Sequence, residues 1–500
     1  MTSDQPTDNV RRDRAVGAVL ASAAADALGA PHEFGPALDP ATVLEMTGGG
    51  PFPWAPGEWT DDTQTALAIL EPLSRGVAAE AIPDEVTLGL LAWFAGRPPD
   101  VGIQTRAVLS EAARSTKSLA EVTAAWQATR PESSGNGSLM RTGPLAIAGS
   151  SGSSGSERTE LADLARNTSA LTHASADAVE ACVLWTDAIR RAIDAPVEAE
   201  GSVDWVGHVA AGLDLLAEDR RGLWAERLAA VGTTPPEQFT PNGYVVSAMQ
   251  AALGALAHTE VPADQPCRHL RLAIERAIRI GDDTDTVATI CGSLAGAWWG
   301  ASAVPLEWRR VLHGRAIGAL PAMTAADLDR LARLADAGGK DDRIGWPSAE
   351  RLIPYYESHF PADPLAEALD GSVTVGNVHA LAGQLDQVDT VVSLCRMGRA
   401  DVPAGVEHQV IGLLDTTPAD NPNVGFVLDD TAAYVADQVA SGRTVFLHCV
   451  QAHNRTPAVA AAYLMRTQGI GVDDALDRVF ALTCTRPQKF LIDGLRSLEG

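Results

Sequence analysis

The sequence predicts a multidomain protein, with an all-α domain followed by a smaller α/β domain. Helical periodicity runs from about residue 12 to residue 336. A polar stretch with several prolines follows, and short apolar runs typical of strands then alternate with helical runs. We therefore expect domains at 10–338 and 370–500, joined by a linker at 339–369.

The helical assignment of the first domain depends on apolar residues that recur at spacings of three and four. Aromatic residues make up only 5% of the chain, whereas Ala and Gly are abundant, which favours closely packed helices over a β-sandwich. We expect helices at 12–28, 63–75, 103–114, 158–171, 176–193, 205–217, 245–257, 269–279, 286–300 and 325–336.

Beyond the expected linker, the pattern changes to short β-rich runs. Helical runs at 428–440 and 457–468 alternate with these runs, as in an α/β domain. We expect strands at 372–378, 390–395, 409–414 and 444–449.

Charge and cysteine usage limit the partners and the compartment. The 500 residues include 64 acidic and 38 Lys or Arg residues, so the formal net charge of −26 disfavours nucleic acid and anionic membranes as partners. The uncharged run 286–306 fits a buried core helix better than a membrane span. Six scattered cysteines with no CxxC pair favour a reducing, cytoplasmic location.

Two stretches with similar sequences, 61–69 and 282–290, match at five of nine positions. Each places carboxylates and threonines just before an apolar helical run. Acids and threonines at helix starts can serve only as caps. If the two helix starts meet, however, four carboxylates repel one another, and hard divalent cations relieve that repulsion.

Oxygen-only ligands suit Mg²⁺, Mn²⁺ or Ca²⁺ rather than zinc. Two Mg²⁺ ions would balance the four carboxylates, and Mn²⁺ is a possible substitute. The predicted metal ligands are Thr60, Asp61, Asp62, Asp283, Asp285 and Thr286.

A third feature is the glycine-containing segment 135–141, which reads GNGSLMR. Glycines allow a tight turn that brings backbone N–H groups close to a phosphate. Taken alone, such a segment is more often an ordinary turn.

These motifs together resemble the ADP-ribosylglycohydrolase family. The resemblance covers about 10–335 and rests on motifs in the family's order: DALG at 26–29, Glu33, WTDDT at 59–63, GNGSLMR at 135–141, LTH at 171–173 and GDDTDTVATICGSLAGA at 281–297. It implies an all-α fold with a two-metal site, usually Mg²⁺, that cleaves ADP-ribose from proteins or small molecules.

The resemblance also implies roles for single residues. The six predicted metal ligands match the family's ligands, whereas Asp282 replaces a small residue and is left out. Glu33 matches a glutamate near the substrate ribose, and Asp100 resembles an aspartate near the ribosyl carbon. His173 either touches the nucleotide ribose or fixes a helix. The turn that resembles the family's diphosphate-binding part contains Gly135, Asn136, Gly137 and Ser138.

Metals at this site can orient a water and lower its pKa. The general base would be Glu33, Asp100 or a metal ligand, and the sequence leaves this choice open.

The second domain contains a cysteine in the pattern C-x5-R-T. Cys449 ends a buried strand, and Arg455 and Thr456 precede a helix. A helix dipole, loop amides and an arginine stabilise a thiolate and also hold a phosphate. A free cysteine is, however, most often only a small buried apolar residue.

Over about 370–495 the chain resembles the dual-specificity, cysteine-dependent protein phosphatases. The resemblance implies that Cys449 attacks phosphorus, Arg455 binds the phosphate, Thr456 assists the leaving thiolate and Asp415 protonates the leaving oxygen. Ala452 stands where that family usually has glycine. If this position needs positive φ, Ala is strained there, and the domain is a weak phosphatase or a phosphate- or nucleotide-binding module.

The sequence thus predicts a hydrolase that removes ADP-ribose from an ADP-ribosylated protein, with an arginine linkage favoured, or from a small-molecule ADP-ribose derivative. The second domain would act on a phosphorylated substrate. Two alternatives remain: an ADP-ribose- and phosphate-binding protein without hydrolysis, and a cysteine phosphatase with a non-catalytic helical scaffold.

Overall fold

A computed structural model describes residues 6–147, 155–196, 203–317 and 322–499. The chain forms two compact units. The first contains Met1–Pro262, Arg268–Val304 and Val311–Lys340, and the second contains Ala263–Cys267, Pro305–Arg310 and Asp341–Gly500. Each unit is described by itself.

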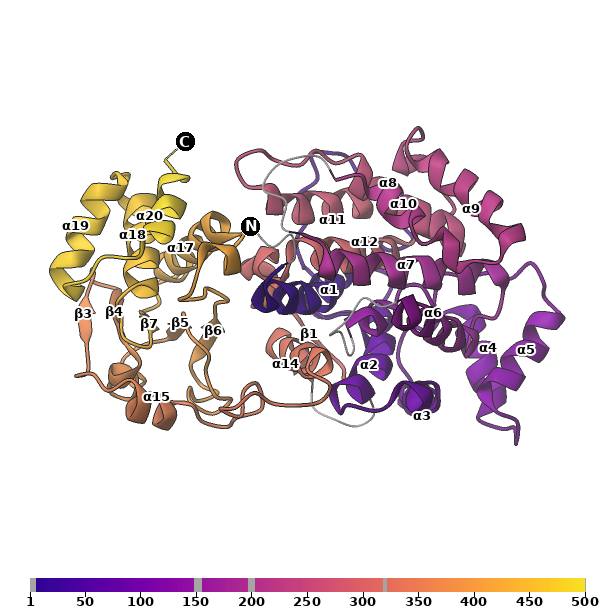
Figure 1. The fold of residues 1–500 in the computed structure, drawn as a ribbon, viewed down its shortest axis with the longest axis horizontal. Coiled ribbons are helices and arrows are strands. Elements are labelled where there is room, and N and C mark those ends of the chain that lie inside the picture. The colour runs from indigo at the N-terminus through magenta and orange to yellow at the C-terminus, as the bar shows by residue number, and fades with distance from the viewer. Residues whose placement is uncertain (1–5, 148–154, 197–202, 318–321, 500) are drawn as a thin grey trace. The chain divides into compact units, whose positions relative to one another are not determined.

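The first unit is built almost wholly of helices (Figure 1). One two-residue hairpin ladder, between β1 (His313–Gly314) and β2 (Met323–Thr324), is the only sheet in its described part. The helices are α1 (Asp8–Gly29), α2 (Asp61–Ser74), α3 (Ile82–Ala95), α4 (Ile103–Ala112), α5 (Leu119–Ala128), α6 (Gly155–Ala170), α7 (Ala176–Asp194), α8 (Trp205–Ala210), α9 (Glu218–Val231), α10 (Val245–Ala257), α11 (His269–Arg279), α12 (Thr284–Trp299) and α14 (Ala325–Asp336).

The mostly helical character predicted for the first domain is confirmed, and one predicted helix is shorter than expected. The pattern at 205–217 predicts a single helix, but α8 ends at Ala210 and a 3-10 turn, Leu213–Leu215, follows. Gly212 separates the two, and glycine destabilises a helix interior.

Helices α1 and α12 pack with their backbones in close contact. A Cβ atom on Gly296 would lie 2.0 Å from the carbonyl oxygen of Gly17, so this crossing accepts no side chain. A Cβ on Gly29, the last residue of α1, would lie 2.6 Å from Cα of Asp285. The end of α1 therefore lies directly against the start of α12, where the second acidic cluster begins.

The second unit contains a five-stranded sheet with strand order β3-β4-β7-β5-β6. Strands β4, β7, β5 and β6 are parallel, and β3 pairs antiparallel with β4 at one edge. The α/β character predicted for this region is confirmed. The strands are β3 (Ala366–Ala368), β4 (Val373–Asn377), β5 (Thr390–Ser393), β6 (Glu407–Val410) and β7 (Val445–Cys449).

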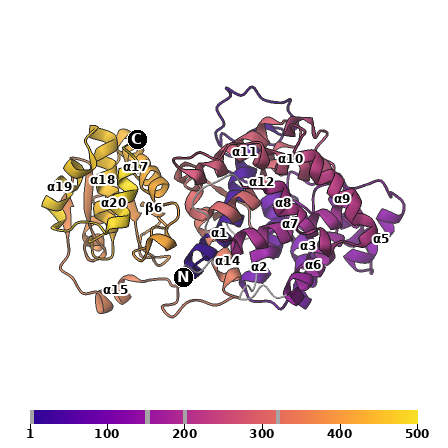
Figure 2. The same ribbon diagram turned by 45° about the horizontal axis from the view of Figure 1, so that its top comes forward.

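Helices cover the two faces of this sheet unequally (Figures 1 and 2). Val375, Val392 and Leu447 of the sheet pack in one apolar core together with residues of the larger group of helices. Val391 and Phe446 belong to a second core on the other face. The larger group comprises α17 (Val424–Ala440), α18 (Arg455–Gln468), α19 (Val472–Thr483) and α20 (Lys489–Arg496).

The segment expected as a linker, 339–369, contains regular structure. Helix α15 (Ile353–His359) places Tyr356 in the second core of the sheet, and strand β3 forms the sheet edge. The four-residue helix α13 (Leu306–Arg309) and the short helix α16 (Leu381–Gln384) complete the second unit. In the described parts of the chain, no helix is long and apolar enough to span a bilayer.

Candidate active site

The two acidic helix starts of the first unit meet, which is the condition under which the sequence predicts a cation site. Thr60 is the N-cap of α2, and its hydroxyl donates a hydrogen bond of 3.4 Å to Oδ2 of Asp285 in the first turn of α12. In return, the Thr286 hydroxyl donates one of 3.3 Å to Oδ2 of Asp62. Both helix N-termini therefore face the same cluster of acids, where their dipoles favour negative charge.

Asp26 of α1 belongs to this cluster, although its sequence motif alone indicates no role for it. Its carboxylate accepts hydrogen bonds from the backbone N–H of Thr60 at 3.0 Å and from the hydroxyl of Thr63 at 2.6 Å. Asp26 is fully buried, and burial raises its pKa to about 6. Its position at the C-terminal end of α1 fixes the start of α2 relative to α12.

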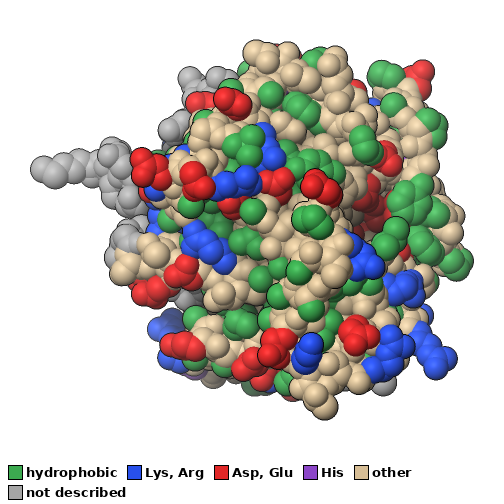
Figure 3. Space-filling view, turned by 90° about the vertical axis from the view of Figure 1, so that its right-hand side faces the viewer, with side chains coloured by type: hydrophobic (Ala, Val, Ile, Leu, Met, Phe, Trp, Pro, Cys, Tyr) green, Lys and Arg blue, Asp and Glu red, His purple; other side chains and the backbone are tan. Residues whose placement is uncertain are grey.

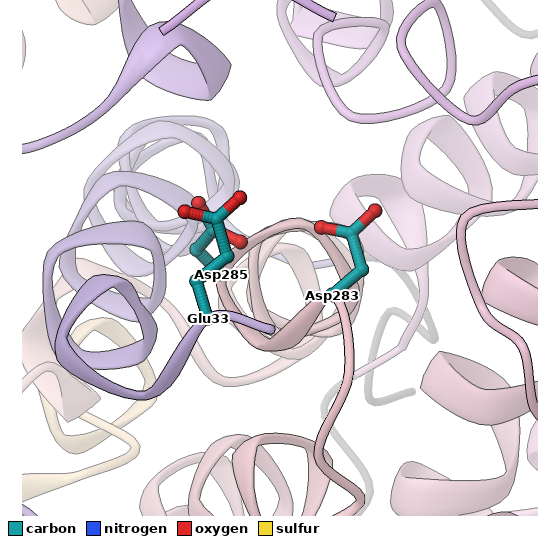
Figure 4. A group of neighbouring side chains, drawn as sticks. All are labelled: Glu33, Asp283 and Asp285. Atoms are coloured by element: carbon teal, nitrogen blue, oxygen red, sulfur yellow. The ribbon is translucent and has the colours of Figure 1, made fainter. Parts of the chain in front are cut away.

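Glu33 follows the short 3-10 turn Ala30–His32 and joins the acids of α12. Carboxylate oxygens of Glu33, Asp283 and Asp285 all lie within 4.8 Å of one another. Figure 4 shows these carboxylates on the same side of the start of α12. This spacing suits three oxygen ligands around one cation.

Burial and mutual repulsion strongly perturb these carboxyl groups. Burial, with the charges of Asp100 and Asp283, raises the pKa of Glu33 to about 9. Burial, with neighbouring acids, also holds the pKa values of Asp62 and Asp285 well above their usual range. A cation would remove this cost, because it favours the ionised form of every acid around it.

Two oxygens of the cluster have no partner among the described residues. Oδ1 of Asp62 and Oε2 of Glu33 are buried, and no described donor reaches either atom. Buried polar atoms are nearly always paired, and exceptions indicate a strained, catalytic or ion-binding group. These two oxygens, with the all-oxygen donor set around them, fit a hard divalent cation.

Asp100 lies beside this cluster rather than inside it. Its carboxyl group hydrogen-bonds that of Asp61, and after burial its negative charge is the largest cause that raises the pKa of Asp61. Asp100 is half-buried. The structure therefore groups Glu33 with the predicted ligands Asp283 and Asp285. A hydrogen bond from Thr286 joins the predicted ligand Asp62 to this group, and Asp61 lies close enough for the charges of Glu33 and Asp100 to raise its pKa.

The glycine-containing turn joins the cluster through Asn136. Its side-chain amide donates a hydrogen bond of 2.7 Å to Oδ2 of Asp283. Gly135 on the same turn forms an isolated antiparallel bridge with Tyr244.

Asn242, which the sequence analysis did not single out, connects this turn to the acids. Its side-chain oxygen accepts from the backbone N–H of Asp283 at 2.8 Å, and its backbone carbonyl accepts from Asn136 at 3.1 Å. The backbone N–H of Asn242 donates a hydrogen bond to the Asp282 carboxylate, so Asp282 has a structural role. The PNGY segment around Asn242 has no counterpart in the acidic repeats, so pattern alone did not reveal it.

Ser138 and His173 lie behind the turn. The Ser138 hydroxyl accepts a hydrogen bond of 2.9 Å from Ser169, so it faces the interior of the unit. A Cβ on Gly137 would lie 3.3 Å from Nε2 of His173, so the imidazole packs against the turn.

On the face shown in Figure 3, acidic side chains lie in a hollow bordered by hydrophobic ones.

In the second unit, the predicted cysteine loop lies between a strand end and a helix start. Cys449 is the last residue of β7 and is buried, and Arg455 is the first residue of α18. Ala452 has a φ of 57°, so this position does take the left-handed conformation that favours glycine. The Thr456 hydroxyl donates to the carbonyl of Gly376 at 3.4 Å.

Asp415 converges on the same loop. Its carboxylate lies 3.7 Å from Nη2 of Arg455 and accepts a hydrogen bond of 3.0 Å from the Asn454 side chain. The side chain of Gln488 donates to the same carboxylate at 3.3 Å. Within the described residues, Nε of Arg455 is buried without a partner. Arginine, acid and cysteine loop therefore come together in this unit.

Fold and site together define a helical protein whose acidic cluster, at two facing helix starts, can hold a hard cation. Residues 7–343 match the family model described as ADP-ribosylglycohydrolase. The chain belongs to this family, and it is an ADP-ribosyl hydrolase. The match ends before most of the second unit.

Relatives with related activities cover the same part of the chain. ADP-ribosylarginine hydrolase Tri1 of Pseudomonas putida (strain GB-1) is 32% identical over 305 residues, which are 59% of this chain and 73% of the relative. ADP-ribosyl-[dinitrogen reductase] glycohydrolase of Rhodospirillum rubrum is 28% identical over 305 residues, which are 59% and 89% of the two chains. The solved "ADP-ribosylglycohydrolase-related protein complex" is 29% identical, with a TM-score of 0.50, and covers 66% of this chain and 99% of that chain.

Proposed function

We propose that the first unit cleaves the bond between ADP-ribose and an arginine side chain of a modified protein, with two Mg²⁺ ions at the acidic cluster. The observation that carries this proposal is the reciprocal contact of Thr60 with Asp285 and of Thr286 with Asp62, which joins the two acidic helix starts into one site. Similarity to a relative named an ADP-ribosylarginine hydrolase supports the arginine linkage.

The predicted ligands would hold the ions through oxygen atoms alone, which suits Mg²⁺ and also Mn²⁺. Bound Mg²⁺ supplies Lewis acidity, which lowers the pKa of a coordinated water. The unpaired Oδ1 of Asp62 supplies a further donor at the site.

Glu33 is our candidate for the general base, because its Oε2 is buried and has no described partner. It takes a proton from the attacking water, whose oxygen bonds to the anomeric carbon of the ribose. The bond from that carbon to the guanidinium nitrogen breaks with its electron pair on nitrogen, so the cationic guanidinium leaves as neutral guanidine, which then takes the proton held by Glu33. Asp100, hydrogen-bonded to Asp61, is placed beside this reaction and would orient the arginine.

The test is ADP-ribose release by the full chain from proteins modified on arginine or on serine. We expect release from arginine-linked substrate. Release from the serine-linked protein alone would support the hydrolase activity but overturn the proposed arginine linkage. Tight ADP-ribose binding without release from either substrate would favour a binding protein.

Glu33→Gln tests the base. We expect kcat to fall by about 100-fold or more while substrate binding remains, since a general base contributes roughly 10²–10⁴ in rate. Glu71→Gln on α2 is a matched control, because burial also raises the pKa of Glu71 although it lies outside the cluster. An unchanged kcat in Glu33→Gln would assign the proton transfer to another acid.

For the second unit we propose a cysteine-dependent phosphatase activity on a phosphorylated substrate. The supporting observation is the convergence of Arg455 with Asp415, 3.7 Å apart, at the loop that Cys449 begins. Sγ of Cys449 would attack phosphorus as the thiolate, and Asp415 would give its proton to the leaving oxygen. Water would then hydrolyse the phosphocysteine.

p-Nitrophenyl phosphate hydrolysis by the full chain tests this activity. We expect Cys449→Ser to abolish it and to leave ADP-ribose release intact. Cys484→Ser is the matched control, because Cys484 is an exposed free cysteine of the same unit. Loss of ADP-ribose release in Cys449→Ser would instead support a phosphatase with a non-catalytic helical scaffold.

A further inference from the structure

A buried chain of three side chains leads to the glycine-containing turn. Nη2 of Arg141 donates a hydrogen bond of 2.6 Å to Oγ1 of Thr172, and Oγ1 lies 2.8 Å from Nδ1 of His173. All three residues are at most 2% exposed. Arg141 also donates to the carbonyl oxygen of Gly137, at 3.2 Å, so it holds both the turn and this chain.

The direction of the hydrogen bonds in this chain follows from the donor inventory. Arginine is a donor only, so Thr172 accepts from Arg141. The hydroxyl has one proton, and its remaining partner among the described residues is Nδ1 of His173. Pairing every group therefore makes Nδ1 an acceptor, which leaves the proton of the neutral imidazole on Nε2.

The imidazole is neutral throughout the physiological range. Burial, with the nearby charge of Arg141, lowers the pKa of His173 to about 3. The neutral ring can still exist as either of two tautomers, and the Thr172 hydroxyl selects the one with the proton on Nε2.

Nε2 lies against the turn, close to both of its glycines. Cβ atoms added to Gly135 and Gly137 would lie 3.5 Å and 3.3 Å from this nitrogen. No hydrogen-bond acceptor for Nε2 occurs in the described part of the chain. Between the two glycines, Asn136 reaches Asp283 of the acidic cluster, so the free N–H lies beside the residue that touches the site.

We propose that Arg141 and Thr172 are positioning residues that fix His173 as an Nε2–H donor for an oxygen of the ADP-ribose part of the substrate. The inference rests on the proposed function for its ligand, whereas the tautomer is a property of the protein alone. Because the imidazole is neutral throughout the physiological range, this donor does not change with pH there.

Two variants separate positioning from folding. Thr172→Val keeps the shape of the side chain and removes the hydroxyl, and Thr172→Ser restores it. Thr123→Val is the matched control, because Thr123 is fully buried and its hydroxyl bonds the carbonyl of Leu171, next to Thr172, without touching His173.

The first readout is the tautomer of His173, measured by two-bond ¹H–¹⁵N NMR on the full chain with ¹⁵N-labelled histidine and no ligand. We expect the Nε2–H form alone in the wild type, Thr172→Ser and Thr123→Val, and a mixture with the Nδ1–H form in Thr172→Val. An Nδ1–H or mixed wild type would overturn the inference whatever the protein's function.

The second readout is the Kd of ADP-ribose, measured by calorimetry in the presence of Mg²⁺. We expect it to weaken roughly tenfold in Thr172→Val and to stay unchanged in Thr123→Val, since one hydrogen bond to a charged oxygen contributes about this factor. Equal affinity in Thr172→Val and the wild type would overturn the assignment of the donor to the substrate. A wild type that binds no ADP-ribose would overturn the proposed function, and the substrate part of this inference with it.

Discussion

The hydroxyl of Thr286 donates a hydrogen bond of 3.3 Å to the carboxylate of Asp62, across 224 positions of the sequence. The bond from Thr60 to Asp285 mirrors it. Thr286 of the second stretch therefore holds an acid of the first, and Thr60, which directly precedes the first stretch, holds an acid of the second. This exchange explains why a threonine and carboxylates occur together at each of the two helix starts, whereas a helix cap alone needs only one such residue.

Asn242 positions Asp283, and its loss should weaken cation binding. Asn242→Ala removes the acceptor of the Asp283 N–H and the donor to the Gly281 carbonyl. We expect the affinity for Mn²⁺ to fall by about 10-fold or more, as is typical when an outer partner of a metal ligand is lost. Calorimetric titration of the metal-free protein with Mn²⁺ measures this.

Asn421→Ala is the matched control for that experiment. Asn421 is also buried, and it also bridges loop backbone, at Leu414 and Thr417 of the second unit. A comparable loss of Mn²⁺ affinity in both variants would show general destabilisation instead of positioning.

The metal-free protein should lose stability as the pH rises from 7 to 9. The pKa of Glu33 is raised to about 9, mainly by burial, so the folded state holds a proton that the unfolded chain has already released. Stability from such a group is complete below its unfolded pKa and is lost as the pH rises through its folded pKa.

The buried histidines do not mask this loss of stability between pH 7 and pH 9. Burial lowers the pKa values of His173, His208 and His269 to about 3, 4 and 4. A histidine whose pKa is lowered on folding reduces the stability of the folded protein only as the pH falls below about 6.5. Thermal unfolding in EDTA should therefore give a lower Tm at pH 9 than at pH 7, and added Mg²⁺ should raise Tm more at pH 9. An equal effect of Mg²⁺ at both values would contradict the account.

The strain at Ala452 predicts unequal effects of two Ala→Gly changes. Ala452 and Ala461 are both fully buried in the second unit, but only Ala452 has a positive φ. Both changes remove a buried methyl group and add backbone freedom, and Ala452→Gly alone relieves a left-handed backbone. We expect Ala461→Gly to lower the free energy of unfolding by about 1–2 kcal/mol more than Ala452→Gly does.

Chemical denaturation of the two variants measures this difference. Equal destabilisation would mean that the loop bears no strain at Ala452. If the second unit is a phosphatase, Ala452→Gly should also retain or increase the hydrolysis of p-nitrophenyl phosphate.

The sequence predicted the parts of the site that repeat or that carry charge in a pattern. The pairing of 61–69 with 282–290 was visible because the two stretches match, and the conditional expectation of positive φ at Ala452 is met in the structure. The role of Asp26 was not visible, because it depends on how the end of α1 packs against the start of α2. Asn242 sits on a loop without periodicity, so only the folded structure shows its contacts.

Strand prediction failed where the residues lack a strand pattern. Strand β3 has the sequence AEA and pairs only at the sheet edge, so no alternation indicates it. The strand predicted at 409–414 is shifted, since β6 spans Glu407–Val410 and its residues are half-buried. The predicted run begins at Gln409 because the apolar residues that follow the strand resemble a strand themselves.

The most direct test of the central claim is ADP-ribose release from an arginine-ADP-ribosylated protein, with Mg²⁺ and with EDTA, by the wild type and Asp62→Asn. Asp163→Asn, an exposed acid on α6, is the control. We predict release that requires Mg²⁺ and falls by at least about 100-fold in Asp62→Asn, since the metal site supplies the nucleophile. Release that persists in EDTA, or that Asp62→Asn leaves unchanged, would contradict a catalytic cation site at the two helix starts.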